Sequence, residues 1–324
     1  MCTAVSMTAG DHYFGRNLDL EYAYQEAVAV MPRRFPLALR RMPALSTHLA
    51  MIGVATVADG YPLYYDAANE TGLSIAALNF PGYAHYAPPS DHLDNIAPWE
   101  LIPWLLAQCS CVSQARALLA RMNLCALPFS GALPLSPLHF MISDKRESIV
   151  VEPMQDGLRI HDNPVHVLTN NPPFDYHLLN LSGYMSLSNQ PPENRLDPAL
   201  NLTPYSRGMG AIGLPGDLSS ASRFVRAAFM RANSLSGSTP EEGVTQFFHI
   251  LSSVAHVRGS VMVEGKPEIT VYSSCCDTKR GIYYYTTYEN SQITAIDMHK
   301  ENLDGHNLSV FPLKRRQQLL WLNG

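Results

Sequence analysis

The sequence predicts an α+β fold in which antiparallel sheets and helices form separate layers. In its first third, short apolar runs are separated by turn signals such as Gly10-Asp11 and Asp59-Gly60, with no crossover helices between them. Two helical stretches follow, strands return, and two more helices precede a last set of strands. Sheets that must bury both faces, with helices between them in sequence, are typical of a layered sandwich.

The strands of the first third are predicted over residues 2–7, 12–18, 27–31, 51–57, 63–68 and 73–80. A helix over 101–108 follows Pro98, because proline suits the first turn of a helix. A second helix, over 112–122, has one apolar face made of Ala115, Leu118, Leu119 and Met122. Residues 124–137 contain three prolines and a glycine and are predicted to be a loop.

The rest of the chain continues this plan. Strands are predicted over 138–143, 148–153, 158–161 and 165–169, and Asp156-Gly157 is a strong hairpin signal. Helices follow over 222–233 and 240–254, the second opened by the capping box Thr239-Pro240-Glu241-Glu242. The final strands cover 260–263, 269–274, 282–288 and 293–298. No internal repeat or linker is visible, so we expect one domain over residues 1–324.

Composition argues against several classes of protein. The 324 residues are 46% hydrophobic and 16% charged, and the formal net charge of −5 makes nucleic acid an unnatural partner. Residues 1–20 lack the features of a signal peptide, and no apolar run is long enough for membrane insertion. We therefore expect a cytoplasmic protein whose six cysteines are reduced. Neither the cysteines nor the twelve histidines have ligand spacing, so we expect no metal and no cofactor.

Cys2 is the residue with the clearest chemical potential. A small side chain at position two permits removal of Met1, after which the mature chain begins with Cys2. A thiol, with a reference pKa of about 8.5, and an α-amine, at about 7.7–8.0, then belong to one residue. Together they supply the nucleophile and the base of an N-terminal nucleophile. A Met-Cys start is common by chance, so this hypothesis needs support from the rest of the chain.

Further sequence blocks supply that support. In chain order they include Met1-Cys2-Thr3-Ala4, Tyr13-Phe14-Gly15-Arg16-Asn17-Leu18-Asp19, Leu78-Asn79-Phe80-Pro81-Gly82-Tyr83, Ser148-Ile149-Val150-Val151-Glu152, Val167-Leu168-Thr169-Asn170-Asn171-Pro172, Ser222-Arg223-Phe224-Val225-Arg226 and Tyr285-Thr286-Thr287-Tyr288. These blocks span nearly the whole chain and resemble the choloylglycine hydrolase family, which includes bile salt hydrolases and penicillin V acylases. The resemblance implies a four-layer αββα sandwich of antiparallel sheets, the N-terminal nucleophile hydrolase fold.

The resemblance also implies roles for the first block of residues. Cys2 would attack an amide carbonyl while its own α-amine takes and returns the proton. Asp19 would orient the amine, and Arg16 would favour the thiolate as a neighbouring cation does. Without the resemblance, a surface ion pair would be the simpler interpretation of Arg16 and Asp19. Because these two residues are three apart, a regular strand points them to opposite faces, and a bend near Leu18 is needed to bring both to one site.

An attacked amide develops an oxyanion that needs prepositioned donors. By resemblance these donors are the main-chain N–H of Asn79 and the side-chain amide of Asn170. Taken alone, Asn79 also suits an ordinary strand end, and Asn170 suits a local turn before Pro172. Arg223 matches a family arginine that supports the charges near the nucleophile, although a solvated residue in the first turn of a helix is the alternative.

The type of residue at Asn79 bears on the substrate. Bile salt hydrolases resemble this chain in having asparagine there, whereas penicillin V acylases typically have an aromatic residue. The resemblance therefore favours hydrolysis of glycine- or taurine-conjugated bile acids, with the conjugated bile salt as partner. Two alternatives stay open: a penicillin V acylase or another N-acyl amidase of the same mechanism, and a non-catalytic bile-acid or lipid-binding protein that retains Met1.

A steroid substrate needs an apolar pocket. Leu18, Tyr22 and Tyr24 alternate after Arg16 and can line one side of it. Tyr65 and the 129–138 loop, with Phe129 and Leu135, are further candidates. Each of these residues would equally suit ordinary packing.

Residues 180–221 form the longest irregular stretch, and long loops are often functional or oligomeric. By analogy with the family, this segment is a candidate assembly element of a homotetramer.

Overall fold

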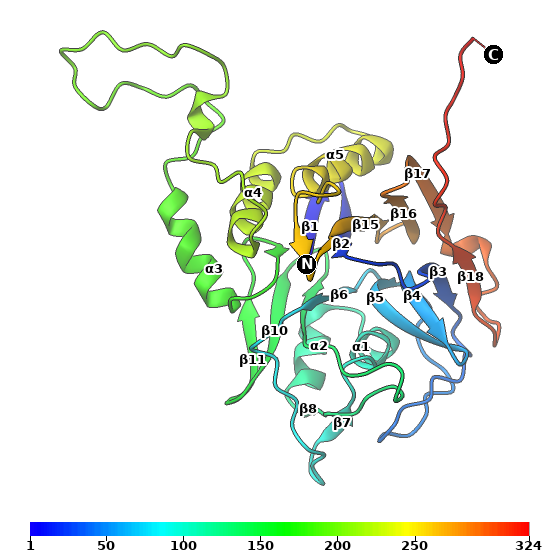
Figure 1. Ribbon diagram of the computed structural model, residues 1–324. Coiled ribbons are helices and arrows are strands. Elements are labelled where there is room, and N and C mark those ends of the chain that lie inside the picture. The colour runs from blue at the N-terminus through cyan, green and yellow to red at the C-terminus, as the bar shows by residue number, and fades with distance from the viewer. Residues whose placement is uncertain (324) are drawn as a thin grey trace.

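Two antiparallel sheets face each other in the computed structural model, which describes residues 1–323 (Figure 1). One sheet runs in the order β12 (Val167–Leu168), β1 (Cys2–Ala9), β2 (Asp11–Leu20), β15 (Ile269–Asp277), β16 (Ile282–Thr287) and β17 (Asn290–Asp297). The other runs in the order β11 (Gly157–Asp162), β10 (Ser148–Met154), β9 (Leu138–Ser143), β6 (Ser74–Asn79), β5 (Tyr61–Asn69), β4 (Met51–Ala58), β3 (Ala27–Met31) and β18 (Ser309–Pro312).

Helices cover the outer faces of both sheets. Helices α4 (Ser220–Ala232) and α5 (Pro240–Ser252) pack on the sheet that contains β1, and α1 (Leu101–Gln108) packs on β5 and β6 of the other sheet. Helix α2 (Val112–Leu119) contributes Val112, Ala115 and Leu119 to the same core as α1. The order of layers is helix, sheet, sheet, helix, which confirms the predicted αββα sandwich.

Small side chains allow β1 and β2 to lie buried at the centre of the fold. Strand β1 buries Ala4 and Val5 completely, and β2 is buried along almost its whole length. A strand enclosed on both faces shows no alternation of apolar and polar residues. Gly15 is required here, because a Cβ atom at this position would lie 2.0 Å from the main-chain oxygen of Ser274 on β15. The glycine of the second sequence block thus permits close approach of β2 to its neighbour.

Most predicted elements match the structure within a few residues, and several short ones were missed. The second predicted helix ends at Leu119, because Met122 belongs to β8 (Met122–Leu124), which pairs with β7 (Asp94–Ile96). Strand 165–169 is reduced to the two residues of β12. The predicted strand 260–263 is reduced to β13 (Met262–Val263). The other unpredicted elements are α3 (Phe174–Leu181), β14 (Lys266–Pro267), β18 and the single turns η1 (Ser182–Tyr184), η2 (Met209–Ala211) and η3 (Met298–Lys300).

Two segments extend from the layered body (Figure 1). The chain between η1 and η2 forms a long arm, and the end of the chain projects from the sheets only after residues 314–318, which still hydrogen-bond to β16 and β17. The arm exposes large apolar side chains, namely Met185, Leu196, Leu200, Leu202 and Tyr205. Among residues 1–323, no helix has the length and apolar character needed to cross a membrane.

Candidate active site

Strand pairing decides which side chains share a face with Cys2. In the hairpin of β1 and β2, Cys2 lies opposite Leu18 and Ala4 lies opposite Arg16. Cys2, Arg16 and Leu18 therefore point to the side of the second sheet, where all three line a cavity. Thr3 and Asn17, also opposite each other, point to the helix side, where they contact Arg223 and the carbonyl of Leu251.

Arg16 and Asp19 lie on opposite faces of β2. The guanidinium of Arg16 reaches across to the second sheet, and Asp19 accepts a 2.6 Å hydrogen bond from Thr270 on the other side. The pairing of β1 with β2 is continuous, and the irregularity occurs in β15, between Thr270 and Tyr272. Strand β2 as described therefore lacks the expected bend near Leu18 that would turn Arg16 and Asp19 to one face. The two charged groups therefore lie on opposite faces of the sheet, next to β1.

Arg16 is a fully buried cation beside Cys2. Its Nη1 donates to the carbonyls of Tyr65 and Ala77, and Nε donates to its neighbour Asn17. Burial disfavours the charged form, but the nearby Cys2 thiol and then Tyr272, Asp66 and Asp19 outweigh it and raise the pKa of Arg16. The guanidinium is therefore permanently charged, and a cation at this position favours the thiolate of Cys2.

Asp66 of β5 is a buried carboxylate that sequence reasoning missed. It accepts hydrogen bonds from Tyr272 at 2.6 Å, Tyr283 at 2.5 Å and Ser274 at 3.1 Å. Burial raises the pKa of Asp66, opposed first by Arg16 and then by these hydroxyl groups. Ser274 also accepts from the main-chain nitrogen of Arg16. Asp66 thus connects the buried arginine to β15 and β16. No motif in the sequence marks it.

Asn170 connects the two sheets at the start of β1. Its side-chain oxygen accepts 2.8 Å hydrogen bonds from the main-chain nitrogen of Cys2 and from Arg223, and its Nδ2 donates to the carbonyl of Asn79 at 2.7 Å. Because the oxygen meets two donors and the nitrogen meets an acceptor, the orientation of the amide is determined by its partners. An amide NH₂ group carries two hydrogens, and the bond to Asn79 uses one of them. The structure therefore brings Cys2, Asn79 and Asn170 together.

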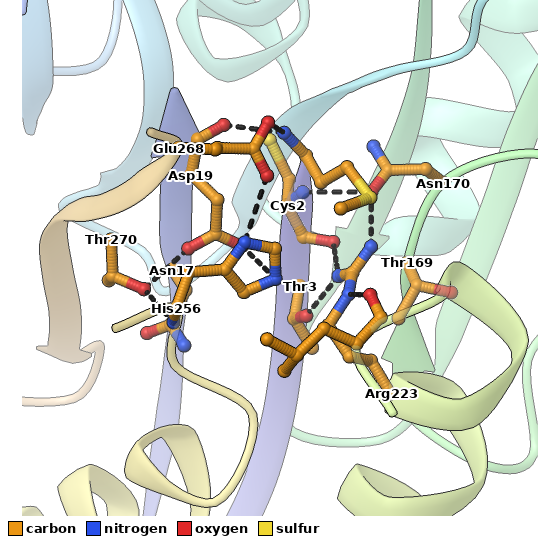
Figure 2. Close-up of polar contacts among 12 residues, drawn as sticks. Cys2, Thr3, Asn17, Asp19, Thr169, Asn170, Arg223, His256, Glu268 and Thr270 are labelled. Carbon is orange, nitrogen blue, oxygen red and sulfur yellow. Dashed lines mark hydrogen bonds and ion pairs between the residues drawn. The ribbon is translucent and has the colours of Figure 1, made fainter. Parts of the chain in front are cut away.

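Arg223 holds this arrangement from α4. The side chain is completely buried, and it donates to the carbonyl of Cys2, to Thr3 at 2.7 Å and to Leu218 at 3.0 Å. Burial lowers the pKa of Arg223, and the opposing effects come from Asp19, Cys2 and Glu268. A solvated position at a helix start, the alternative interpretation, does not match this burial. The helix presents the cation inward to the first strand (Figure 2).

A second polar cluster surrounds the first residue. The terminal amine of Met1 donates to the carbonyl of Asp19 at 2.5 Å and forms a 2.8 Å ion pair with Glu268. His256 lies between the carboxylates of this cluster, with Nδ1 2.9 Å from Glu268 and Nε2 3.9 Å from Asp19 (Figure 2). Neither His256 nor Glu268 was marked by the sequence blocks. They come from the far end of the chain, and only the fold brings them to Met1.

The cavity beside Cys2 has a volume of about 590 Å³ and mainly apolar walls. This size lies within the range of small-molecule sites. The predicted residues Leu18, Tyr24, Tyr65, Phe129 and Leu135 all line it, together with Arg16 and Asn79. Leu133 and Leu138 of the predicted 129–138 loop line it as well. Wall residues that were not predicted include Leu20, Glu21, Thr56, Leu63, Tyr64 and Trp99.

Tyr22 does not line this cavity, contrary to expectation. The expectation extended the alternation of β2, but the strand ends at Leu20. Beyond that point the backbone no longer alternates, and the ring of Tyr22 lies half-exposed against Tyr24 and Lys266. It lines a separate, much smaller depression. Alternation along Leu18 and Leu20 would have identified Leu20 instead.

Among residues 1–323, no group of three or more His, Cys, Asp or Glu side chains is arranged to hold a metal ion. Cys109, Cys125, Cys275 and Cys276 are buried, and none of the six cysteines in the described chain is paired in a disulfide. Burial raises the pKa of the thiols of Cys275 and Cys276 well above the ordinary value.

An αββα sandwich whose first strand begins with a cysteine in the wall of a cavity is the architecture of an N-terminal nucleophile hydrolase. The family model for linear amide C–N hydrolases, choloylglycine hydrolase family, matches residues 2–311. The chain belongs to the choloylglycine hydrolase family.

Individual relatives agree with this assignment. A bile salt hydrolase/transferase of Lactiplantibacillus plantarum is 52% identical over 324 residues, which is 100% of both chains. The crystal structure of the C2A mutant of conjugated bile acid hydrolase from Clostridium perfringens gives a TM-score of 0.92 at 40% identity and covers 100% of both chains. A penicillin V acylase from Agrobacterium tumefaciens gives 0.75 at 19% identity, over 96% of this chain and 91% of its own, and shares the fold.

Proposed function

We propose that this chain hydrolyses the amide bond of glycine- or taurine-conjugated bile acids. The observation that carries the proposal is the apolar cavity of about 590 Å³ with Cys2, Arg16 and Asn79 in its wall. A steroid is large and mainly apolar, so it suits such walls, and its amide can lie at the polar end. The relatives that are 52% and 41% identical to this chain are each named bile salt hydrolase/transferase, which supports the same substrate class.

The reaction begins once Met1 has been removed. The α-amine of Cys2 takes the proton of the thiol, and sulfur attacks the amide carbonyl carbon. The resulting oxyanion is stabilised by the main-chain N–H of Asn79 and the free N–H of Asn170. The C–N bond breaks, the α-ammonium gives its proton to the departing glycine or taurine, and a thioester on Cys2 remains. Water then cleaves the thioester, with the α-amine as base.

The supporting residues have distinct parts in this proposal. Arg16 stabilises the thiolate from the cavity side. Asp19 and Arg223 act from the helix side, the first on the amine and the second by holding the carbonyl of Cys2 and the amide of Asn170. Leu18, Tyr24, Tyr65, Phe129 and Leu135 bind the steroid.

Amine release tests the substrate directly. Purified enzyme is incubated with taurocholate, glycocholate and penicillin V, and the free amine is quantified while intact mass reports whether Met1 is present. We expect rapid release of taurine or glycine. Dominant turnover of penicillin V with negligible bile salt cleavage would favour the acylase alternative, and steroid binding without turnover by a chain that retains Met1 would favour a binding protein.

A second activity is favoured by the name of a relative. The 52% identical relative is called a hydrolase/transferase. A thioester can be attacked by an amine instead of water, which returns the thiol of Cys2 and forms a new amide. Addition of a free amino acid during taurocholate turnover would then give the corresponding new conjugate, detected by mass spectrometry.

We further propose that residues 1–324 form one catalytic domain that assembles as a homotetramer in the cytoplasm of a bacterium. The exposed apolar residues of the 180–221 segment favour assembly, because large exposed apolar patches mark interaction surfaces. Unpaired cysteines suit a reducing compartment. Light scattering of the wild type and of Leu196→Ser/Leu202→Ser/Tyr205→Ser tests the assembly, and the variant is expected to have a lower mass. Cell fractionation tests the compartment.

A further inference from the structure

Around the first residue, two buried carboxylates converge on one imidazole. Nδ1 of His256 lies 2.9 Å from Glu268 Oε1, and its Nε2 lies 3.9 Å from Asp19 Oδ2. Asp19 is fully buried, and His256 and Glu268 are 1% and 3% exposed. Buried charges need opposite charge nearby, so two carboxylates around one imidazole indicate a cation at this place.

In the chain that retains Met1, the ion is the terminal ammonium. The main chain of Met1 pairs with that of Asp19, since the amine of Met1 donates to the carbonyl of Asp19 and the amide of Asp19 donates to the carbonyl of Met1. The same amine lies 2.8 Å from Glu268. Burial alone would raise the pKa of Glu268, but His256 and the terminal ammonium lower it. Glu268 is therefore a buried anion that depends on nearby positive charge.

Removal of Met1 takes this cation away and creates another one residue later, at Cys2. A buried carboxylate left without its cation would be strongly destabilising, and the new ammonium is the nearest replacement. The other charged or titratable groups that face this position are Asp19 and Arg16 from β2, the Cys2 thiol from β1, Arg223 from α4, and His256.

We propose that Glu268 and His256 are positioning residues that, together with Asp19, form a carboxylate–imidazole–carboxylate chain holding the catalytic α-ammonium of Cys2. The proposal rests on the proposed function of the amine as proton acceptor and donor. Glu268 stabilises the ammonium through its negative charge. His256 lies between the two carboxylates and keeps them directed at the N-terminus.

The Glu268–His256–Asp19 side chains lie outside the cavity, so their effect on proton transfer can be distinguished from an effect on substrate binding. Asp19 faces the helix side of β2, whereas the cavity lies on the opposite side and does not include His256 or Glu268. Loss of either residue should therefore change proton transfer and leave the affinity for the steroid unaltered. A purely structural role would not produce this separation.

The test compares Glu268→Gln, Glu268→Asp and His256→Gln in chains shown by intact mass to begin at Cys2. Glu70→Gln, which removes a carboxylate paired with Arg33, and His48→Gln, which replaces another buried histidine, are matched controls away from the cavity. Melting curves of all variants show that they fold.

For Glu268→Gln we expect the acid limb of the pH profile of kcat/KM for taurocholate to move down by roughly one pH unit or more, because a nearby carboxylate favours the protonated amine. Glu268→Asp keeps the charge and should keep the limb near that of the wild type. His256→Gln should lower kcat roughly fivefold or more with KM unchanged, since positioning errors of this kind reduce the rate of the chemical step.

The reactivity of the Cys2 thiol can be measured without a bile salt, so it tests the role of Glu268 independently of the proposed hydrolysis. Alkylation of Cys2 by iodoacetamide, followed by peptide mass spectrometry across pH, should show the same shift to lower pH in Glu268→Gln. If the wild type cleaves no bile salt, the proposed function fails and the alkylation profile still tests the inference. Coincident alkylation and kcat/KM profiles for Glu268→Gln, wild type and Glu70→Gln would overturn it.

Discussion

The main-chain nitrogen of Cys2 donates a 2.8 Å hydrogen bond to the side-chain oxygen of Asn170. This nitrogen is the atom that becomes the α-amine when Met1 is removed. The amide of Asn170 therefore touches the proposed base through its oxygen and faces the proposed oxyanion through its nitrogen. One side chain thus fixes the geometry of both, and Arg223 fixes that side chain.

Replacement of Cys2 by alanine should abolish bile salt hydrolysis, because no other group at this position can form the thioester. Cys2 contributes little to the core beyond its small volume, so melting temperature and steroid binding should stay close to those of the wild type. Taurine release and equilibrium binding of taurocholate measure the two properties. Turnover above about a tenth of wild type would contradict the assignment of Cys2 as nucleophile, since loss of a catalytic nucleophile costs several orders of magnitude.

Asn170→Ala should lower kcat by roughly a hundredfold to a thousandfold, equivalent to about 2.7–4 kcal/mol for loss of one oxyanion donor. Asn170→Asp preserves the oxygen that accepts from Cys2 and Arg223 and removes the donor, so it separates the two roles. A similar loss in both variants identifies the donor as the critical group. Near-normal kcat in Asn170→Asp would show that stabilisation of the oxyanion does not come from this amide.

Phe129→Ala should weaken the binding of conjugated bile acids. Phe129 lies in the cavity wall against Trp99, and burial of a phenylalanine side chain contributes about 1.5–3 kcal/mol, so KM should rise roughly tenfold or more. Tyr22→Ala is the matched control, because Tyr22 lies outside the cavity. Iodoacetamide reactivity of Cys2 should be unaffected in both. Equal KM values for the two variants would place the steroid elsewhere.

The lowered pKa of the buried Glu152 predicts that the stability of the fold depends on pH. Burial raises its pKa, but contacts with His139 and His161 and the main-chain nitrogen of Phe174 outweigh burial and lower it from 4.5 to about 2. Because folding lowers this pKa, the ionised carboxylate stabilises the folded state fully above about pH 4.5 and loses this effect as the pH falls through about 2.

Glu152→Gln should therefore reduce the free energy of unfolding at pH 7, by an amount on the order of 3 kcal/mol. The difference from wild type should shrink as the pH is lowered below 4.5. Urea titrations at several pH values measure it, and Glu289→Gln, at an exposed ion pair, is the control. A difference that does not depend on pH would mean that the charge of Glu152 is not its stabilising property.

The sequence predicted the parts of the fold whose signals are local. The capping box at Thr239 marks the start of α5, and Asp156-Gly157 marks the hairpin of β10 and β11. Helix α3 and strand β18 were missed because non-local contacts determine them: α3 packs on α4, and β18 pairs with β3 from the other end of the chain.

The candidate site divides in the same way. The residues in contiguous blocks, such as Arg16 and Asn170, were identifiable by resemblance, and the cavity includes most of the predicted wall. Asp66, His256 and Glu268 have no such block, since each becomes significant only through partners far away in sequence. Arg16 and Asp19 lie on opposite faces of β2, as the alternation of a regular strand predicts, so β2 does not contain the bend near Leu18 that was expected from the resemblance.

The mass of the active enzyme tests the central claim most directly. Protein that begins at Cys2 and protein that retains Met1, prepared by withholding the aminopeptidase, are compared for taurine and glycine release at equal concentration. We predict release only by the chain whose intact mass lacks Met1, because only there is the amine next to the thiol free to accept a proton. Equal release by a chain that retains Met1 would contradict the account.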